Sequence, residues 1–231
     1  LLIRRSNDPE YLIELAFPIR LSFPFLYRGL VVVGDFWKTA ASRTDEGDMN
    51  AAQLIGQFVV KEAASGKDVV LESLWRDQRC VVMFFRRFAC PYCRMDAVHL
   101  SKLKPQLDQA NVRLVGIGHE KAGLEDFQKQ EFFKGELYID VEKNAYKALQ
   151  FKRFNYFNIF PAILTSTARA KAAEAKEANV GGDLTTGDGL QTGGTLIVEK
   201  GGSSVLLNFK QESPEDYVGN STILEALGIT A

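Results

Sequence analysis

Cysteine and histidine are scarce in this chain, and neither is distributed as a metal site or a secreted scaffold requires. The 231 residues include only three Cys and two His. Three Cys, with two of them in one tetrad, do not resemble the disulfide framework of a secreted protein, so we expect a reducing compartment and a cytoplasmic location. Cys80, His99 and His119 lack the spacing of metal ligands, so we expect no metal.

The chain also lacks a large net charge and a long apolar run. Its formal net charge of −1 gives no electrostatic footprint for nucleic acid or for an anionic membrane surface. Residues 11–37 are apolar in patches, but Pro18, Arg20, Pro24 and Arg28 keep every patch well short of the ~20 residues that span a bilayer. The N-terminal part also lacks the basic start and small-residue cleavage site of a signal peptide. We therefore expect neither a nucleic-acid partner nor an integral membrane segment.

The composition changes near residue 48, which divides the chain into two parts. Residues 1–48 form a poorly characterised N-terminal extension for which three interpretations remain open: a loosely packed extension, a targeting remnant, or upstream sequence translated in error. The last is favoured because a polar, turn-like stretch, Arg43–Asn50, surrounds Met49, the first Met of the chain. Residues 49–231 have the natural size of one α/β domain.

Strand and helix patterns alternate through residues 49–231. The continuous apolar run Cys80–Phe85 is typical of a central strand covered on both faces. Helices are expected at Pro91–Ala110 and at the Ala/Lys/Glu-rich Ala162–Ala178, and Thr195–Glu199 with Val205–Lys210 should form a hairpin. This order predicts an α/β, thioredoxin-like fold with a central mixed sheet flanked by helices.

Ala-Cys-Pro-Tyr-Cys at residues 89–93 is the segment that carries chemistry. Pro91 suits the first position of a helix, which makes Cys90 the N-cap residue, at the positive end of the helix dipole. Cys93 falls one turn inward and should be more buried. We expect an exposed, ionised Cys90 that attacks and a shielded Cys93 that resolves, as thiol–disulfide exchange needs. Half of a zinc site and an inert structural pair remain the alternatives.

Three arginines bracket the cysteine pair. Arg86, Arg87 and Arg94 should lower the pKa of the attacking thiol, and any of them could hold an anionic substrate or stabilise a developing alkoxide. Arg86 and Arg87 also follow the carboxyl end of the central strand, where open α/β sheets place their ligands. Cys80 begins that strand, roughly 20 Å away at ~3.3 Å per residue, and should be a core residue.

The remaining candidates carry weaker signals. His99 should be a surface or packing residue, whereas His119 follows a strand and is placed to face the site. The aromatic block at residues 151–160 is typical either of core packing or of a lipid-sized pocket, with core packing the more frequent outcome.

Several separated blocks resemble one known family. Residues 84–94, Phe-Phe-Arg-Arg-Phe-Ala-Cys-Pro-Tyr-Cys-Arg, look like the redox motif of the peroxiredoxin-like 2 family, and residues 133–138 and 193–196 are similar to other segments of that family. The similarity covers roughly residues 49–231. It implies a cytosolic thioredoxin-fold reductase that converts the endoperoxide of prostaglandin H2, or of its ethanolamide, to the F2α diol with NADPH as electron source. A general thiol peroxidase or redox regulator acting on hydroperoxides or protein disulfides is the alternative, and a non-enzymatic binding module is the third.

The resemblance leaves the order of the two cysteines open. Peroxiredoxins carry Pro-x-x-x-Thr-x-x-Cys, and aligning Cys93 with their attacking sulfur puts Arg86 and Cys90 at the Pro and Thr positions. The thioredoxin alignment favours Cys90, which the N-cap argument also supports. Thioredoxins carry a cis-proline opposite the redox pair, and Gly194-Thr195 stands there instead, so Thr195 joins the candidate site.

The electron source is open as well. Gly116-Ile117-Gly118 lacks the third glycine of a dinucleotide-binding turn. Hydride transfer from NADPH to a disulfide normally uses a flavin. A relay through thioredoxin is therefore the easier route for electrons from NADPH.

Overall fold

A mixed sheet forms the centre of residues 50–230, the part of the chain that this computed structural model describes, with residues 160, 162 and 163 described by backbone alone. The strand order is β2-β1-β5-β4-β3-β6-β7. The parallel strands β3, β4 and β5 are flanked by antiparallel neighbours on both sides. The strands are β1 Val59–Glu62, β2 Asp68–Val70, β3 Arg79–Phe84, β4 Val112–Gly118, β5 Glu136–Ile139, β6 Gly194–Val198 and β7 Val205–Lys210. The α/β, thioredoxin-like prediction is confirmed.

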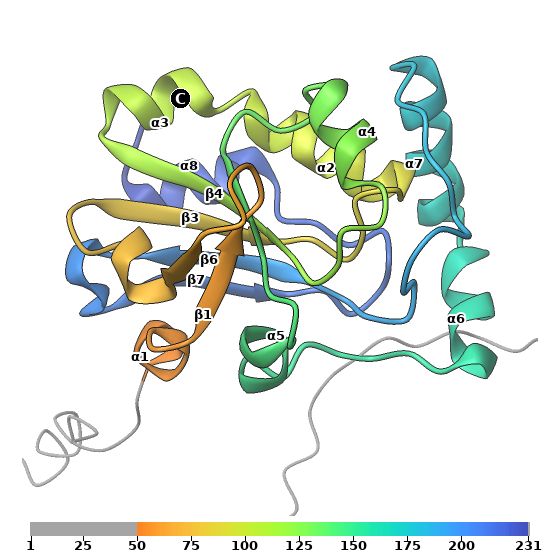
Figure 1. The fold of residues 1–231 in the computed structure, drawn as a ribbon. Coiled ribbons are helices and arrows are strands. Elements are labelled where there is room, and N and C mark those ends of the chain that lie inside the picture. The colour runs from red at the N-terminus through yellow and green to blue at the C-terminus, as the bar shows by residue number, and fades with distance from the viewer. Residues whose placement is uncertain (1–49, 231) are drawn as a thin grey trace, which may run out of the picture. The chain divides into compact units, whose positions relative to one another are not determined.

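Helices cover both faces of the sheet (Figure 1). Helices α2, α4, α7 and α8 lie over one face, and the short α1 and α5 lie over the other. Each face has its own cluster of buried apolar side chains, and burial of this apolar surface is the main stabilising term of the fold. The helices are α1 Ala51–Ile55, α2 Pro91–Ser101, α3 Lys104–Gln109, α4 Leu124–Lys129, α5 Asn144–Ala148, α6 Tyr156–Ile163, α7 Ser166–Glu177 and α8 Asn220–Leu227, with 3-10 turns η1 Leu71–Leu74 and η2 Lys200–Gly202.

Two helices that the sequence predicts as continuous are interrupted. The expected helix over Pro91–Ala110 ends at Ser101 and resumes at Lys104, because Pro105 has no N–H to continue the ladder. The expected helix over Ala162–Ala178 is likewise divided. Thr165 caps α7 there by accepting the N–H of Ala168 at 3.0 Å.

The carboxyl end of β3 is the point from which the candidate site departs. Phe84 is the last residue of the strand, and Tyr146 on α5 donates a hydrogen bond to the carbonyl oxygen of Phe85 at 2.8 Å. The chain then turns through Arg86–Ala89 into α2. The hairpin of β6 and β7 is confirmed, and β6 lies antiparallel beside β3.

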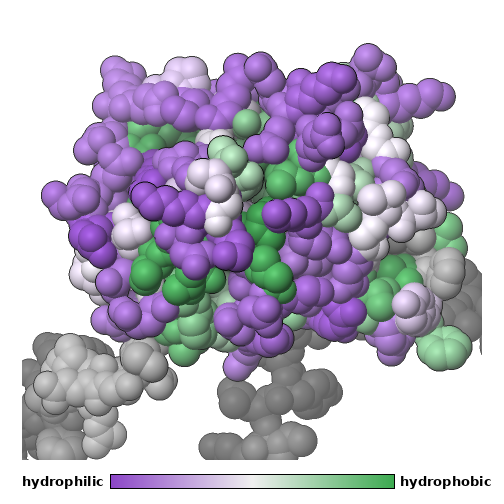
Figure 2. All heavy atoms as spheres, viewed as in Figure 1, coloured by the Kyte–Doolittle hydropathy of each residue, from purple (hydrophilic) through white to green (hydrophobic). Residues whose placement is uncertain are grey.

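The surface of the described residues is mostly polar. Figure 2 shows hydrophilic side chains over most of the face drawn in Figure 1, with apolar side chains in small separate groups. None of the described helices combines the length and apolar character that crossing a membrane requires. The extension predicted at residues 1–48 lies outside the described residues.

Candidate redox site

Cys90 and Cys93 occupy the start of α2. Cys90 is the N-cap residue with extended backbone, and Pro91 is the first helical residue, as the sequence predicts. The expectation of an exposed attacking sulfur is wrong for this conformation, because Cys90 is 0% exposed and Cys93 is 2% exposed. The sulfur of Cys90 also makes no N-cap hydrogen bond. The pKa of Cys90 therefore depends on neighbouring side chains rather than on capping alone.

A glycine-rich loop, residues 181–189, accounts for the burial of Cys90. The N–H of Asp183 donates to the carbonyl oxygen of Ala89 at 2.8 Å, and Gly182 lies so close that a Cβ there would be 2.7 Å from that same oxygen. Arg87 holds the next part of the loop, because its Nη1 donates to the carbonyl oxygen of Leu184 at 2.9 Å. This segment, called the covering loop below, closes over the redox tetrad.

Arg86 supplies the charge at the sulfur. Its Nη2 lies 2.6 Å from Sγ of Cys90, and its Nη1 donates to the carbonyl oxygen of Gly189 at 3.1 Å. Burial opposes ionisation of Cys90, but hydrogen bonding from Cys93 and the positive charges of Arg86 and Arg87 outweigh it, so the pKa of Cys90 falls well below its ordinary value. The hydrogen bond with Cys90, together with burial, raises the pKa of Cys93 well above its ordinary value. The opposite directions of the two pKa shifts therefore favour Cys90 over Cys93 as the sulfur that ionises.

The structure brings Arg86 and Arg87 to the site, but not Arg94. The side chain of Arg94 points toward α4, where it forms an ion pair with Asp126 at 2.7 Å. It also donates to the carbonyl oxygens of Phe88 at 2.8 Å and Gly181 at 2.9 Å. Arg94 thus fixes the turn before α2 and the start of the covering loop.

Thr195 lies on β6, paired in register with Met83 of β3. It is buried and lines a small cavity with Asp96 and Leu100, away from the pocket beside Arg86. The structure therefore places Thr195 under the middle of α2 rather than at its N-terminus.

Asp96 is a buried group that the sequence prediction missed. It follows Cys93 by three residues, on the same side of α2, and its carboxylate forms a buried ion pair with Lys171 of α7 at 2.5 Å. Burial raises the pKa of Asp96 to about 7, although Lys171 opposes the shift. The three-residue spacing from Cys93 is the only signal in the sequence that pointed to this position.

A pocket of about 550 Å³ opens beside the redox tetrad. Its wall includes Arg86, Arg87 and Tyr92 from the redox segment and Arg153 and Tyr156 from the aromatic block. Cys90 itself does not line it, whereas Arg86, which contacts the sulfur, does. The volume is in the range of pockets that hold small organic ligands.

The aromatic block divides between the two roles expected for it. Phe151 and Phe154 are buried, whereas Tyr156 lines the pocket and is 74% exposed. Phe157 is 92% exposed. Neither core packing nor a lipid pocket alone describes this segment.

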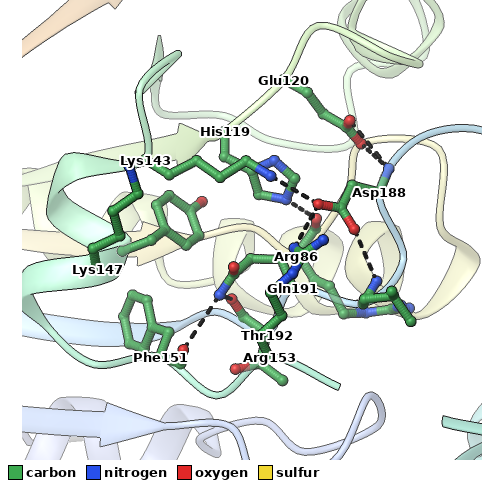
Figure 3. A network of polar contacts seen from close by, with 12 residues as sticks. Arg86, His119, Glu120, Lys143, Lys147, Phe151, Arg153, Asp188, Gln191 and Thr192 are labelled. Atoms are coloured by element: carbon green, nitrogen blue, oxygen red, sulfur yellow. Dashed lines mark hydrogen bonds and ion pairs between the residues drawn. The ribbon is translucent and has the colours of Figure 1, made fainter. Parts of the chain in front are cut away.

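A network of polar contacts supports the pocket (Figure 3). Asp188 of the covering loop is its centre, because its Oδ2 accepts from Nη1 of Arg153 at 2.6 Å and from Nζ of Lys143 at 2.7 Å. The N–H of Asp188 donates to Glu120 at 2.9 Å. Although partial burial opposes it, hydrogen bonds from Arg153 and Lys143 hold the pKa of Asp188 well below its usual range.

The histidines and the third cysteine take the places expected from the sequence. His119 is buried beside the site, with its Nε2 donating to the carbonyl oxygen of Arg86 at 2.8 Å, and burial followed by the charge of Lys143 lowers its pKa to about 4. Nε2 of His99 lies 2.9 Å from a carboxylate oxygen of Glu174. Cys80 is fully buried in the apolar cluster on the opposite face of the sheet from Cys90, so its prediction as a core residue is confirmed.

No group of three or more potential metal ligands was found among the described residues.

Comparison with known proteins gives consistent relatives. The AhpC/TSA antioxidant enzyme family matches residues 99–213. Proteins called prostamide/prostaglandin F synthase from Homo sapiens and Bos taurus are each 50% identical over 177 residues, which cover 77% of this chain and 89% and 88% of theirs. The Xenopus tropicalis protein of that name is 48% identical over the same length.

Solved structures show the same fold at low identity. A peroxiredoxin Q from Xanthomonas campestris aligns with a TM-score of 0.52 at 13% identity, covering 78% of this chain and 93% of that chain. A bacterioferritin comigratory protein from the same organism aligns with a TM-score of 0.50 at 15% identity, covering 78% and 95%.

The fold and the relatives together define a peroxiredoxin-like, thiol-dependent oxidoreductase. With half of the 177 aligned residues identical over most of the length of the relatives, the chain belongs to the prostamide/prostaglandin F synthase family.

Proposed function

We propose that this protein reduces the endoperoxide of prostaglandin H2 and of its ethanolamide, prostamide H2, to the F2α diols through a Cys90/Cys93 dithiol–disulfide cycle. The observation that carries the proposal is the 2.6 Å contact between Sγ of Cys90 and Arg86, a residue in the wall of a pocket of about 550 Å³, in a setting that lowers the pKa of Cys90. Relatives that are 50% identical and are called prostamide/prostaglandin F synthase support this substrate class.

The proposed chemistry is a two-electron reduction of one O–O bond. The Cys90 thiolate attacks one peroxide oxygen, an S–O bond forms, and the O–O bond breaks to leave an alkoxide that takes a proton. The ring structure keeps both oxygens on one molecule, which stays attached to Cys90. Cys93 then attacks the sulfur of Cys90, the S–S bond forms, and the second oxygen leaves and takes a proton. The dithiol is oxidised to the disulfide and the peroxide is reduced to two hydroxyl groups.

Arg86 has two roles in this scheme. It stabilises the thiolate before attack, and it is placed to stabilise the alkoxide that develops when the O–O bond breaks. Arg86 lines the pocket and contacts the sulfur, and we infer that its guanidinium turns aside when substrate reaches Cys90. The guanidinium of Arg86 would then contact the substrate instead of the sulfur of Cys90.

Electrons return to the disulfide most readily through an external dithiol such as thioredoxin, with NADPH as the ultimate donor. Gly116 and Gly118, the pair that resembles half of a dinucleotide-binding turn, lie within β4. A Cβ at Gly116 would be 2.5 Å from the Phe85 ring, and one at Gly118 would be 2.3 Å from the Phe88 ring. These glycines make room for core aromatic rings, so they do not fit a site for the pyrophosphate of NADPH. Thiol exchange with a protein dithiol needs no such site.

We assign this chemistry to a domain of residues 49–231 working in the cytoplasm, since a dithiol cycle needs a reducing compartment. The test compares prostaglandin H2 with hydrogen peroxide as oxidants for the wild type and Cys90→Ser. The proposal expects F2α product from the wild type and none from Cys90→Ser. Faster consumption of hydrogen peroxide with no F-type product would instead support a general thiol peroxidase.

A further inference from the structure

Three arginines line the pocket, and two of them already bind other groups of the protein. Arg86 bonds to the Cys90 sulfur, and Arg87 holds the carbonyl oxygens of Leu184 and Thr186 in the covering loop. Both side chains are buried. A ligand carboxylate on Arg86 would occupy the group that the proposed scheme assigns to the developing alkoxide, and one on Arg87 would displace the loop. The anionic end of a substrate therefore needs a different partner.

Arg153 differs from the other two in exposure and in its contacts. Its side chain is 50% exposed and lines the pocket, and Nη1 is the nitrogen that bonds to Asp188. Among the described residues no other partner of its guanidinium was found. A guanidinium has five N–H donors in a planar fork, so Arg153 can bind a second carboxylate without leaving the first.

Asp188 holds Arg153 in this position. Lys143 donates to the same Oδ2 as Arg153, and the N–H of Asp188 is fixed by Glu120, so the anchor is itself held from two sides (Figure 3). The backbone of Arg153 is held as well, by a bridge to Gln191. Lys143 shares the negative charge of Asp188 with Arg153. The positive charge of Arg153 is therefore only partly compensated and can attract an incoming anion.

We propose that Arg153 binds the carboxylate of the free-acid substrate and thereby sets the preference of the site between the acid and its neutral ethanolamide. This inference rests on the proposed function for its substrate class. Arg153 acts on the end of the lipid remote from the peroxide, so it is a specificity residue that determines binding rather than the chemical step. The ethanolamide can accept a hydrogen bond there but carries no charge to pair.

The first arm of the test measures binding of stable ligands, without turnover. Calorimetric titrations of prostaglandin F2α and its ethanolamide are made with wild type, Arg153→Gln, Arg153→Lys and Lys152→Gln. Lys152 is the matched control, because it is the neighbouring cation, it bonds to Glu212 and it does not line the pocket. A charge-assisted hydrogen bond implies that Arg153→Gln weakens binding of the acid by about ten- to a hundredfold more than binding of the ethanolamide. Arg153→Lys should restore part of this selectivity, and Lys152→Gln should leave it unchanged.

The second arm measures kcat/KM for the two endoperoxides. The acid-to-ethanolamide ratio should fall in Arg153→Gln by a similar factor, mainly through KM, as expected for binding that is equal in the ground state and transition state. Equal losses on both ligands, no loss on either, or no binding of the acid by the wild type would overturn the inference. Selective binding without turnover of either endoperoxide would support the carboxylate site and count against the proposed function.

Discussion

Nη2 of Arg86 lies 2.6 Å from Sγ of Cys90, and both side chains are almost completely buried. The contact joins the last turn of chain before α2 to the helix N-cap. It explains how the pKa of a sulfur without solvent contact and without an N-cap hydrogen bond is still lowered. Arg86 also lines the pocket, so one guanidinium contacts both the sulfur and the open space beside it.

Replacing Arg86 by Gln should return the pKa of Cys90 toward that of a buried thiol, because burial then acts with less opposition. We expect the rate of endoperoxide reduction at pH 7 to fall by about ten- to a hundredfold, the range for loss of a hydrogen bond to a charged group. Arg86→Lys keeps the charge and should retain more activity. The pH–rate profile is the measurement, and a profile identical in wild type and Arg86→Gln would contradict this role.

The order of the two cysteines is testable by trapping. Thioredoxin carrying only its attacking cysteine should form a stable mixed disulfide with the oxidised Cys90 of Cys93→Ser, and mass spectrometry should locate the link at Cys90. The low pKa of Cys90 and the high pKa of Cys93 are the physical reason. Trapping that occurs in Cys90→Ser alone would reverse the assignment.

Opening of the covering loop should expose Cys90. In Gly182→Ala the added Cβ would lie 2.7 Å from both the carbonyl oxygen of Ala89 and the nitrogen of Pro91, so the loop must move away from the tetrad. We expect alkylation of Cys90 to become several times faster. Gly181→Ala is the matched control, because a Cβ there meets nothing within 4 Å and should leave the alkylation rate unchanged. Equal rates in the two variants would show that the loop does not limit access.

Asp96 and His119 should make opposite contributions to the pH dependence of stability. The folded-state pKa of Asp96 is raised to about 7, so its contribution is present below the unfolded pKa of about 3.9 and is lost as pH rises through 7. The folded-state pKa of His119 is lowered to about 4, so its contribution is present above about 6.5 and is lost as pH falls through 4. Between about pH 4 and 6.5 the two effects oppose each other in the wild type.

Chemical unfolding of the single variants should separate them. The free energy of unfolding of the wild type relative to Asp96→Asn should fall as pH rises between 4 and 7, by up to about 1.4 kcal/mol per pH unit. Relative to His119→Gln it should rise between 4 and 6.5. Parallel pH curves for the wild type and both variants would show that neither group titrates as described.

Local sequence rules predicted the parts of the site that local chemistry controls. Pro91 set the start of α2 and therefore the N-cap position of Cys90, and the apolar run before Arg86 marked the central strand. Arg94 follows Cys93 directly in the sequence, which led to the wrong prediction that its side chain lies at the sulfurs. Its place on the helix directs it to Asp126 on α4 instead. The burial of Cys90 was also missed, since it depends on a loop some ninety residues further along the chain.

The pocket was the least predictable part. Arg153 and Asp188 come from segments with no shared periodicity, and they meet because β6 returns beside β3 and carries its preceding loop across the redox tetrad. Asp188 stands between Gly187 and Gly189, a pattern typical of a loop, but nothing in the sequence indicated its partner. The contact became visible once the tertiary structure placed the two segments together.

The ionisation of Cys90 is the central claim, and the ultraviolet absorbance of its thiolate tests it without requiring a reagent to enter the site. The titration is made on Cys93→Ser in the reduced state, with the double variant Cys90→Ser/Cys93→Ser, which keeps only Cys80, as the control. The account predicts a thiolate signal at Cys90 that persists well below the ordinary cysteine pKa of about 8.5 and moves upward in Arg86→Gln. A midpoint at or above about 8.5, unaffected by Arg86→Gln, would contradict it.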